Sequence, residues 1–266
     1  MAPSEVSLPR GFLRPHWNAP AGVNAYVSTR VAAGVSQPPF DSCNVADHVD
    51  DDRGAVARNR ALLSVALDLP AEPLWLRQVH GVTVFDAESS DTNASQWSAP
   101  IVADASRTSR SGRVLAVLSA DCLPVLLCAD DGSEVAAVHA GWRGLAAGVI
   151  EATVQRMRTP APHLLAWLGP AIGPNAFEVG ADVRDAFVSR NASAAVAFRP
   201  LTAVKVTQKW HCDLYQLARQ RLSALGVTRV SGGEFCTFSD PSRFFSHRRD
   251  RATGRMASLI WIEPRG

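Results

Sequence analysis

Cysteine is scarce in this sequence, and closely spaced metal-binding motifs are missing. Only five cysteines occur among 266 residues, widely scattered and without a Cys-x-x-Cys pair. An odd, scattered set is not the disulfide framework of a small secreted domain, so we expect reduced thiols. No two of the seven histidines lie within five positions of each other. That spacing excludes His-Glu-x-x-His zincins, zinc fingers and the paired histidines of true multicopper oxidases. Any metal site must therefore combine distant segments.

Long apolar runs and a marked excess of one charge are also absent. No run approaches the roughly 20 residues that span a bilayer, and the N-terminus lacks a basic segment followed by an apolar one. The net charge of +2 comes from interspersed acidic and basic residues. It gives no electrostatic reason to expect a nucleic-acid or membrane partner. We expect a cytoplasmic protein that acts on a small molecule, and the sequence leaves the oligomeric state open.

The chain has enough apolar residues, 47%, for one sizeable core. Strand and helix patterns occur without strict βαβ alternation, which favours an α+β fold with antiparallel or mixed sheets. Residues 1–22 are expected to be an irregular lead-in, and residues 23–266 a single catalytic domain. Helices are expected over 53–67, 145–157, 181–190 and 214–225. Strands are expected over 23–30, 74–80, 114–118, 164–168, 227–230 and 256–262, with further strand-like runs over 118–127 and 135–139. The polar stretch 88–113 is expected to be mostly loop.

Three metal-capable side chains share one context, because His80, Cys122 and His139 each belong to the end of an apolar, strand-like run. One cysteine with two histidines is a recognised catalytic zinc set that leaves a fourth position open. The same residue types could bind copper, although no axial methionine is evident. They could also form a metal-free Cys–His nucleophilic pair, or be inert core residues. Residue types alone leave these interpretations open.

Residues near these three could bind an anion or a planar ring. The segment His139-Ala-Gly-Trp-Arg-Gly144 would place backbone N–H groups at the start of a helix, which suits phosphate. Asp121 could orient a ligand, activate a water molecule or only cap a turn. Aromatic side chains such as Trp142 could stack on a base or belong to the core. The basic run at 247–249 could bind phosphate, although such runs are usually exposed to solvent.

Several motifs, taken together and in this order, strongly resemble the YfiH-like family. They are Arg77-Gln-Val-His-Gly81, Ser119-Ala-Asp-Cys-Leu-Pro124, His139-Ala-Gly-Trp-Arg-Gly144, Gly169-Pro-Ala-Ile-Gly-Pro174 with Phe177-Glu-Val-Gly180, and Phe244-Phe-Ser-His-Arg-Arg-Asp250 with Thr253-Gly-Arg-Met-Ala257. The resemblance spans residues 23–262. The family is also called laccase-domain or polyphenol-oxidase-like purine nucleoside phosphorylases, or Cu-oxidase_4.

The resemblance implies a single α/β/β/α sandwich, similar to the catalytic domain of cytotoxic necrotizing factor. It implies a zinc site whose ligands are His80, Cys122 and His139. It further implies phosphorolysis of adenosine, inosine and S-methyl-5′-thioadenosine to the free base and ribose 1-phosphate, with an adenosine deaminase activity. Editing of peptidoglycan precursors by a hydrolase and copper-dependent oxidation of polyphenols also accompany the family, and both stay as alternatives.

Our leading hypothesis is a zinc enzyme acting on purine nucleosides and phosphate. Zinc lowers the pKa of a water molecule to about 7, which would allow attack on C6 of adenine. The expected catalytic residues are Asp121, Arg143 and Arg249. The expected substrate or phosphate contacts are Arg30, Asn44, Gln78, Gly141, Trp142, Phe245, His247 and Arg248. In the hydrolase alternative, Cys122 would be the nucleophile and His139 the base. In a non-enzymatic alternative, the metal would only stabilise an interaction module.

Overall fold

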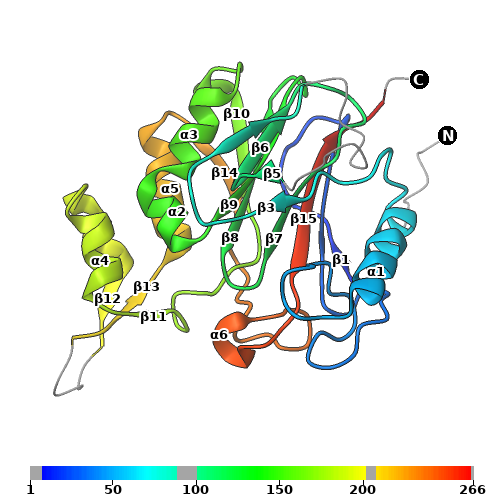
Figure 1. The fold of residues 1–266 in the computed structure, drawn as a ribbon. Helices are drawn as coiled ribbons and strands as arrows, with labels where there is room; N and C mark the ends of the chain where they lie inside the picture. Colours follow the sequence, from blue (N-terminus) through cyan, green and yellow to red (C-terminus); the bar gives the residue numbers. More distant parts are fainter. Residues whose placement is uncertain (1–7, 89–100, 202–207, 265–266) are drawn as a thin grey trace.

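The computed structural model describes residues 8–88, 101–201 and 208–264, which form a mixed α/β fold around two facing sheets (Figure 1). The larger sheet has six strands in the order β14 (Arg229–Gly232), β10 (Leu164–Leu168), β8 (Leu123–Ala129), β9 (Val135–Ala140), β6 (Ala105–Thr108) and β4 (Val84–Asp86). The smaller has four, in the order β1 (Phe12–Leu13), β2 (Val23–Ser28), β15 (Met256–Ile262) and β7 (Leu115–Ser119). Both parallel and antiparallel pairs occur in the larger sheet, as the sequence pattern predicted.

The core consists of three clusters of buried apolar side chains, one between the two sheets and one on the outer face of each sheet. Apolar side chains of both sheets interdigitate between them, including Val117 and Ile260 from one sheet and Leu126 and Trp167 from the other. The outer face of the smaller sheet packs near α1 (Arg53–Ala66). The outer face of the larger sheet is covered by α2 (Trp142–Ala147), α3 (Val149–Arg156) and α5 (Leu214–Ala224). The order of layers is therefore helix, sheet, sheet, helix.

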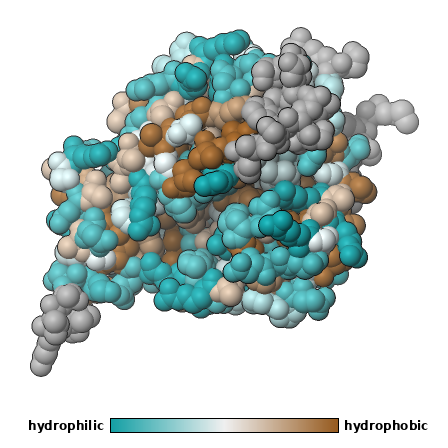
Figure 2. Space-filling view, in the orientation of Figure 1, coloured by the Kyte–Doolittle hydropathy of each residue, from teal (hydrophilic) through white to brown (hydrophobic). Residues whose placement is uncertain are grey.

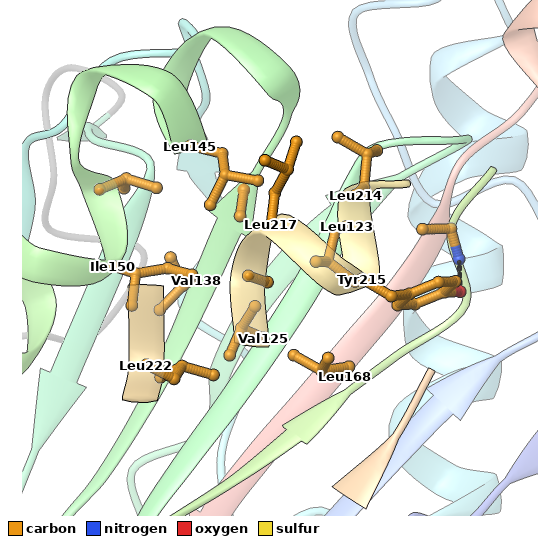
Figure 3. Close-up of a cluster of buried hydrophobic side chains, with 14 of the residues drawn as sticks. Leu123, Val125, Val138, Leu145, Ile150, Leu168, Leu214, Tyr215, Leu217 and Leu222 are labelled. Carbon is orange, nitrogen blue, oxygen red and sulfur yellow. Dashed lines mark hydrogen bonds between the residues drawn. The ribbon is translucent and has the colours of Figure 1, made fainter. Parts of the chain in front are cut away.

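The close-up in Figure 3 shows how the larger sheet meets its helices. Leu123, Val125 and Val138 point from β8 and β9 toward Leu145 of α2 and Leu217 of α5. All residues of β8 and β9 are buried, which explains why these strands occur as continuous apolar runs and not as alternating patterns. Most of the surface seen in Figure 2 is hydrophilic, with apolar side chains gathered toward its middle.

Smaller elements complete the chain. A three-stranded sheet of β11 (Glu178–Val179), β13 (Trp210–Cys212) and β12 (Phe198–Pro200) lies beside α4 (Ala181–Val188). A parallel pair joins β3 (Leu76–Arg77) to β5 (Ile101–Val102). α6 (His247–Asp250) lies at one end of the two sheets, and short 3-10 helices span Ala161–His163 and Ala192–Ala197. Within the described residues, no helix is long and apolar enough to cross a membrane.

Two helix predictions are confirmed by their caps. Asp52 accepts a hydrogen bond from the N–H of Ala55 at the start of α1. Asp213 accepts one from the N–H of Gln216 at the start of α5, and Gly226 follows that helix with a φ of 90°. The single helix expected over 145–157 is wrong. It is divided at Gly148, whose φ of 107° interrupts the helix, and its first part begins earlier, at Trp142.

Two strand predictions also need correction. The run 118–127 is not one strand, because the chain turns at Asp121, with a φ of 92°, and crosses from β7 in one sheet to β8 in the other. Only β3 forms within 74–80. The stretch 88–113, expected to be mostly loop, contains the two short strands β5 and β6, and its residues 89–100 lie outside the described part of the chain. The sequence pattern does not indicate β6, because this strand lacks apolar alternation. Its buried Arg107 is instead paired with Asp86 and Glu134.

Candidate metal and substrate site

The fold brings the three predicted metal ligands together. Their ligand atoms all lie within 4.8 Å of one another, and Nε2 of His80 is 3.6 Å from Sγ of Cys122. The rings of His80 and His139 meet edge to face, with centroids 4.8 Å apart. A tetrahedral zinc ion bound at about 2.0–2.3 Å holds its ligand atoms roughly 3.3–3.7 Å apart. The set therefore fits a metal ion after at most a small inward movement.

Each ligand comes from a different element. Cys122 lies in the turn between β7 and β8, and His139 is the second-last residue of β9. Strand pairing aligns His139 with Pro124, two residues after Cys122, so the register of β8 and β9 places both near one sheet end. His80 follows β3 in a turn with a φ of 60°. Positive φ at His80 and at Asp121 is uncommon for side-chain-bearing residues and is typical of functional sites.

Asp104 connects two of the ligands and was missed by the sequence analysis. It is fully buried, just before β6. Its carboxylate lies 2.9 Å from Nδ1 of His139 and accepts the backbone N–H groups of Val79, His80 and Gly81 at 3.2, 2.8 and 2.7 Å. Burial would raise the pKa of Asp104, but the bonds from His139 and Gly81 outweigh it and lower that pKa. The carboxylate is therefore ionised and shared by both histidine segments.

The charges of Cys122 and His139 are coupled. Burial alone would raise the pKa of the Cys122 thiol, but His139 and His80 outweigh it and lower the pKa to about 6. Burial would lower the pKa of His139, whereas the Cys122 thiolate and the bond to Asp104 raise it to about 9. The thiolate is the form of cysteine that binds metals and acts as a nucleophile. Cys122 is thus prepared for either chemistry near neutral pH.

Close packing explains why positions 141 and 144 of the His139–Gly144 motif are glycine. A Cβ at Gly141 would lie 2.9 Å from Sγ of Cys122 and 2.8 Å from Cδ2 of His80. A Cβ at Gly144 would lie 2.9 Å from the carbonyl oxygen of Gly81. Real Cβ atoms do not approach so closely, so a side chain at either position would displace the ligand segments. These glycines are required by close packing and not by an unusual φ.

A pocket of about 190 Å³ opens beside the ligands. It is lined by His80, Ala120, Asp121, Cys122, Trp142, Arg143, Ile172, Phe177, Leu214, His247 and Arg248. Five residues that the sequence analysis selected beyond the metal ligands are thus at the pocket. Two arginines stack on aromatic rings there, with Arg143 4.4 Å from the Trp142 ring centroid and Arg248 5.1 Å from that of Phe177. The pocket therefore combines apolar ring surfaces with positive charge.

Arg249 is not among the residues that line this pocket. Its guanidinium donates hydrogen bonds to the carbonyl oxygens of Thr237, Phe238 and Phe244 at 2.7–3.0 Å and pairs with Asp250. All five of its N–H donors are accounted for by these contacts and the second bond to Asp250. The phosphate role expected for Arg249 stays a prediction, and the geometry gives this side chain a role in joining loops.

Five other expected substrate contacts also lie outside the lining of the pocket, namely Gly141, the N-cap of α2, and four residues with larger side chains. Arg30 donates to the carbonyl oxygens of Asp41 and Pro241 and stacks on Phe245, whose side chain is fully buried. Asn44 is buried and bonded to backbone of its own loop. Gln78 exchanges two hydrogen bonds with the backbone of residue 118. The substrate roles of all five stay predictions, and each of the four larger side chains already has a structural partner.

Comparisons with known proteins agree over nearly the whole chain. The model of a family described as multi-copper polyphenol oxidoreductase laccase matches residues 24–263. A purine nucleoside phosphorylase of Pseudomonas aeruginosa is 53% identical over 252 residues, which covers 95% of this chain and 98% of that protein. The purine nucleoside phosphorylase YfiH of Escherichia coli is 50% identical over 248 residues, covering 93% and 97%. The crystal structure of a Neisseria meningitidis protein superposes with a TM-score of 0.87 at 44% identity, covering 96% and 100%.

Proposed function

The chain belongs to the multi-copper polyphenol oxidoreductase laccase family, the YfiH-like family that its motifs resemble, and from this premise we propose that it is a metal-dependent purine nucleoside phosphorylase. The observation that carries the proposal is the near full-length identity of about half to relatives named purine nucleoside phosphorylases. The three-ligand set beside a cationic, aromatic pocket supports it. The substrates are a purine nucleoside and inorganic phosphate.

Zinc is the metal that we propose for the site. One thiolate and two imidazoles suit zinc and leave a coordination position for substrate. A blue-copper site would add a weak axial ligand, usually methionine. Within the described residues, no methionine lines the pocket, and Met157 and Met256 are buried in the core clusters. When bound, the ion would supply positive charge that polarises the substrate group facing it.

Arg143 and Arg248 are the phosphate contacts that the geometry favours. In the described part of the chain, the guanidinium of Arg143 stacks on Trp142 and has no hydrogen-bonding or ionic partner, so its donors are available. Arg248 uses one nitrogen to bond the carbonyl oxygen of Glu178 and keeps further donors. Arginine binds phosphate with two parallel N–H groups, and each such charge-assisted bond is stronger than a neutral one. We place phosphate between these two side chains.

Asp121 is proposed to orient the arginine-bearing segment. Its carboxylate accepts the hydroxyl of Thr237 and the backbone N–H of Arg248, each at 2.6 Å. The bond from Arg248 holds the start of α6 at the pocket, and the bond from Thr237 joins Asp121 to a second loop. Because Asp121 also lines the pocket, it is the carboxylate available there to accept a proton from the substrate.

Product analysis tests the proposal. The zinc-loaded chain is incubated with adenosine, inosine or S-methyl-5′-thioadenosine, with and without phosphate, and products are identified by mass spectrometry. We expect free base and a ribose 1-phosphate only when phosphate is present. We also propose deamination of adenosine to inosine, which would proceed without phosphate. A fully zinc-loaded chain that releases no free base from any of the three would contradict the proposed function.

A hydrolase that edits peptidoglycan precursors is the second candidate, because one observation favours it. Asp104, His139 and Cys122 form an array in which a carboxylate orients an imidazole beside a thiolate, as in nucleophilic catalysis. A metal ion held by Cys122 would occupy that thiolate. Metal analysis of the purified active protein discriminates between the two. Full hydrolysis of peptidoglycan precursors by a chain without metal favours the hydrolase, whereas phosphorolysis that requires about one zinc per chain favours the phosphorylase.

A further inference from the structure

We propose that Asp104 is a positioning residue that aligns both histidine ligands of the metal site with one carboxylate. The proposal rests on the metal-dependent function proposed above and adds the residue that arranges its site. Asp104 is fully buried, and its two oxygens accept hydrogen bonds from two segments that lie far from each other in the sequence. A buried carboxylate is costly unless such donors satisfy it. Here four donors do so, and all of them belong to ligand residues or to their immediate neighbours.

Two hydrogen bonds join Asp104 to His139. Oδ1 of Asp104 lies 2.9 Å from Nδ1 of His139, and the backbone N–H of His139 donates to the carbonyl oxygen of Asp104 at 2.7 Å. An ionised carboxylate only accepts hydrogen bonds, so Nδ1 carries the proton. In the neutral ring the lone pair is then on Nε2, the nitrogen left to bind a metal. Carboxylate partners of this kind fix the ring orientation of metal-binding histidines.

Asp104 also binds the backbone of the turn that contains His80. The left-handed backbone at His80, with a φ of 60°, is unfavourable for a residue with a side chain and persists only where the surroundings enforce it. Three consecutive N–H groups, of Val79, His80 and Gly81, converge on the Asp104 carboxylate. They hold the turn that presents the His80 ring 3.6 Å from the Cys122 sulfur. One side chain therefore determines where two of the three ligands stand.

An asparagine at position 104 would have nearly the same shape but only one oxygen. Oδ1 of Asp104 serves His80 N and His139 Nδ1, while Oδ2 serves the N–H groups of Val79 and Gly81. In either orientation, the amide NH₂ of asparagine would face donors. If it faces Nδ1 of His139, it favours the tautomer with the proton on Nε2, which blocks metal binding.

Zinc affinity of the folded protein tests the proposal. We expect Asp104→Asn to bind zinc about 10–100-fold more weakly than the wild type in a chelator competition, which is the usual effect of losing such a partner. Near-UV circular dichroism at the same temperature checks that the variant is folded. The matched control is Asp86→Asn on β4, which breaks a 2.7 Å ion pair with Arg107. We expect this control to lower thermal stability while zinc affinity stays unchanged.

The outcomes separate the two proposals. Wild-type zinc affinity in folded Asp104→Asn, or an equal loss in Asp86→Asn, would overturn the positioning role. A wild-type chain that binds no zinc would instead defeat the proposed metal-dependent function. Nitrogen NMR of the unmodified, zinc-loaded chain gives a second test that needs no variant. It should show His139 protonated at Nδ1 and metal-bound at Nε2, and a proton on Nε2 would overturn the proposal.

Discussion

The two sides of the pocket are positioned by different means. The metal side, His80, Cys122 and His139, is set by the register of two fully buried strands and by the buried carboxylate of Asp104. The arginine side, Arg143 and Arg248, sits on two short helices, and each side chain stacks on an aromatic ring. Arg143 is exposed, whereas His139 is almost completely buried.

This difference matches what each side is proposed to bind. A metal ion requires ligand atoms at nearly fixed distances, which strands and buried hydrogen bonds provide. A phosphate group enters and leaves, and it can be bound by flexible side chains with several donors each. Changes on the metal side should therefore abolish metal binding and activity together. Changes on the arginine side should weaken phosphate binding and leave metal binding unchanged.

Removal of a metal ligand should give the largest effect. We expect Cys122→Ala to lose zinc affinity by more than the roughly 10–100-fold that loss of an outer partner costs, and to lose phosphorolysis with it. Elemental analysis and product assays on the same sample measure both. Wild-type turnover in this variant would refute a metal-centred account.

A steric change behind the ligands should be the next most severe. In Gly141→Ala, the new Cβ would lie 2.8 Å from His80 and 2.9 Å from the Cys122 sulfur, so the ligand atoms must separate. We expect weaker zinc binding with the fold retained. Gly22→Ala is the matched control, since its Cβ would have no neighbour within 4 Å. Equal zinc affinity in the two variants would show that the packing of Gly141 does not matter to the site.

Loss of a phosphate contact should have a smaller and more selective effect. We expect Arg143→Ala to raise the KM for phosphate about tenfold or more, because a hydrogen bond to a charged group contributes about 1.5–3 kcal/mol. Zinc affinity should not change. Arg184→Ala removes another arginine stacked on a tryptophan, Trp210, outside the pocket lining and serves as the control. An unchanged KM for phosphate in Arg143→Ala would remove this residue from the proposed phosphate site.

Arg249 should show the smallest effect on catalysis. Its replacement by alanine leaves the carbonyl oxygens of Thr237, Phe238 and Phe244 without this donor. We expect the free energy of unfolding to fall by about 1–3 kcal/mol, with little change in the KM for phosphate. Urea denaturation and steady-state kinetics measure the two quantities. A rise in KM like that of Arg143→Ala would instead support the phosphate role expected from the sequence.

The sequence analysis could find the metal side because its chemistry is visible in residue types. Thiol and imidazole side chains beside apolar runs are few, and His80, Cys122 and His139 were the ones that shared this context. The structure brings those three together. Asp104 could not be found in the same way, since an aspartate in a polar, turn-rich stretch is typical of loops. The strand that follows it, β6, carries the buried ion pairs of Arg107, which leave no periodic apolar signal.

The arginine side was harder to predict, because charge patterns do not reveal hydrogen-bond partners. Arg248 and Arg249 are neighbours in sequence, yet one lines the pocket and the other is bonded to three loop carbonyl groups. Similarly, apolar spacing predicted α2 and α3 as one helix, because Gly148 fits a helical pattern as well as a break. Tertiary contacts decide both cases.

Zinc titration of the metal-free chain tests the central claim most directly. Phosphorolysis of inosine is measured as zinc is added in known amounts, with bound zinc determined in parallel. The account predicts that free base is released in proportion to bound zinc and that activity levels off near one ion per chain. Full activity before any zinc is bound, or no free base at full occupancy, would contradict it.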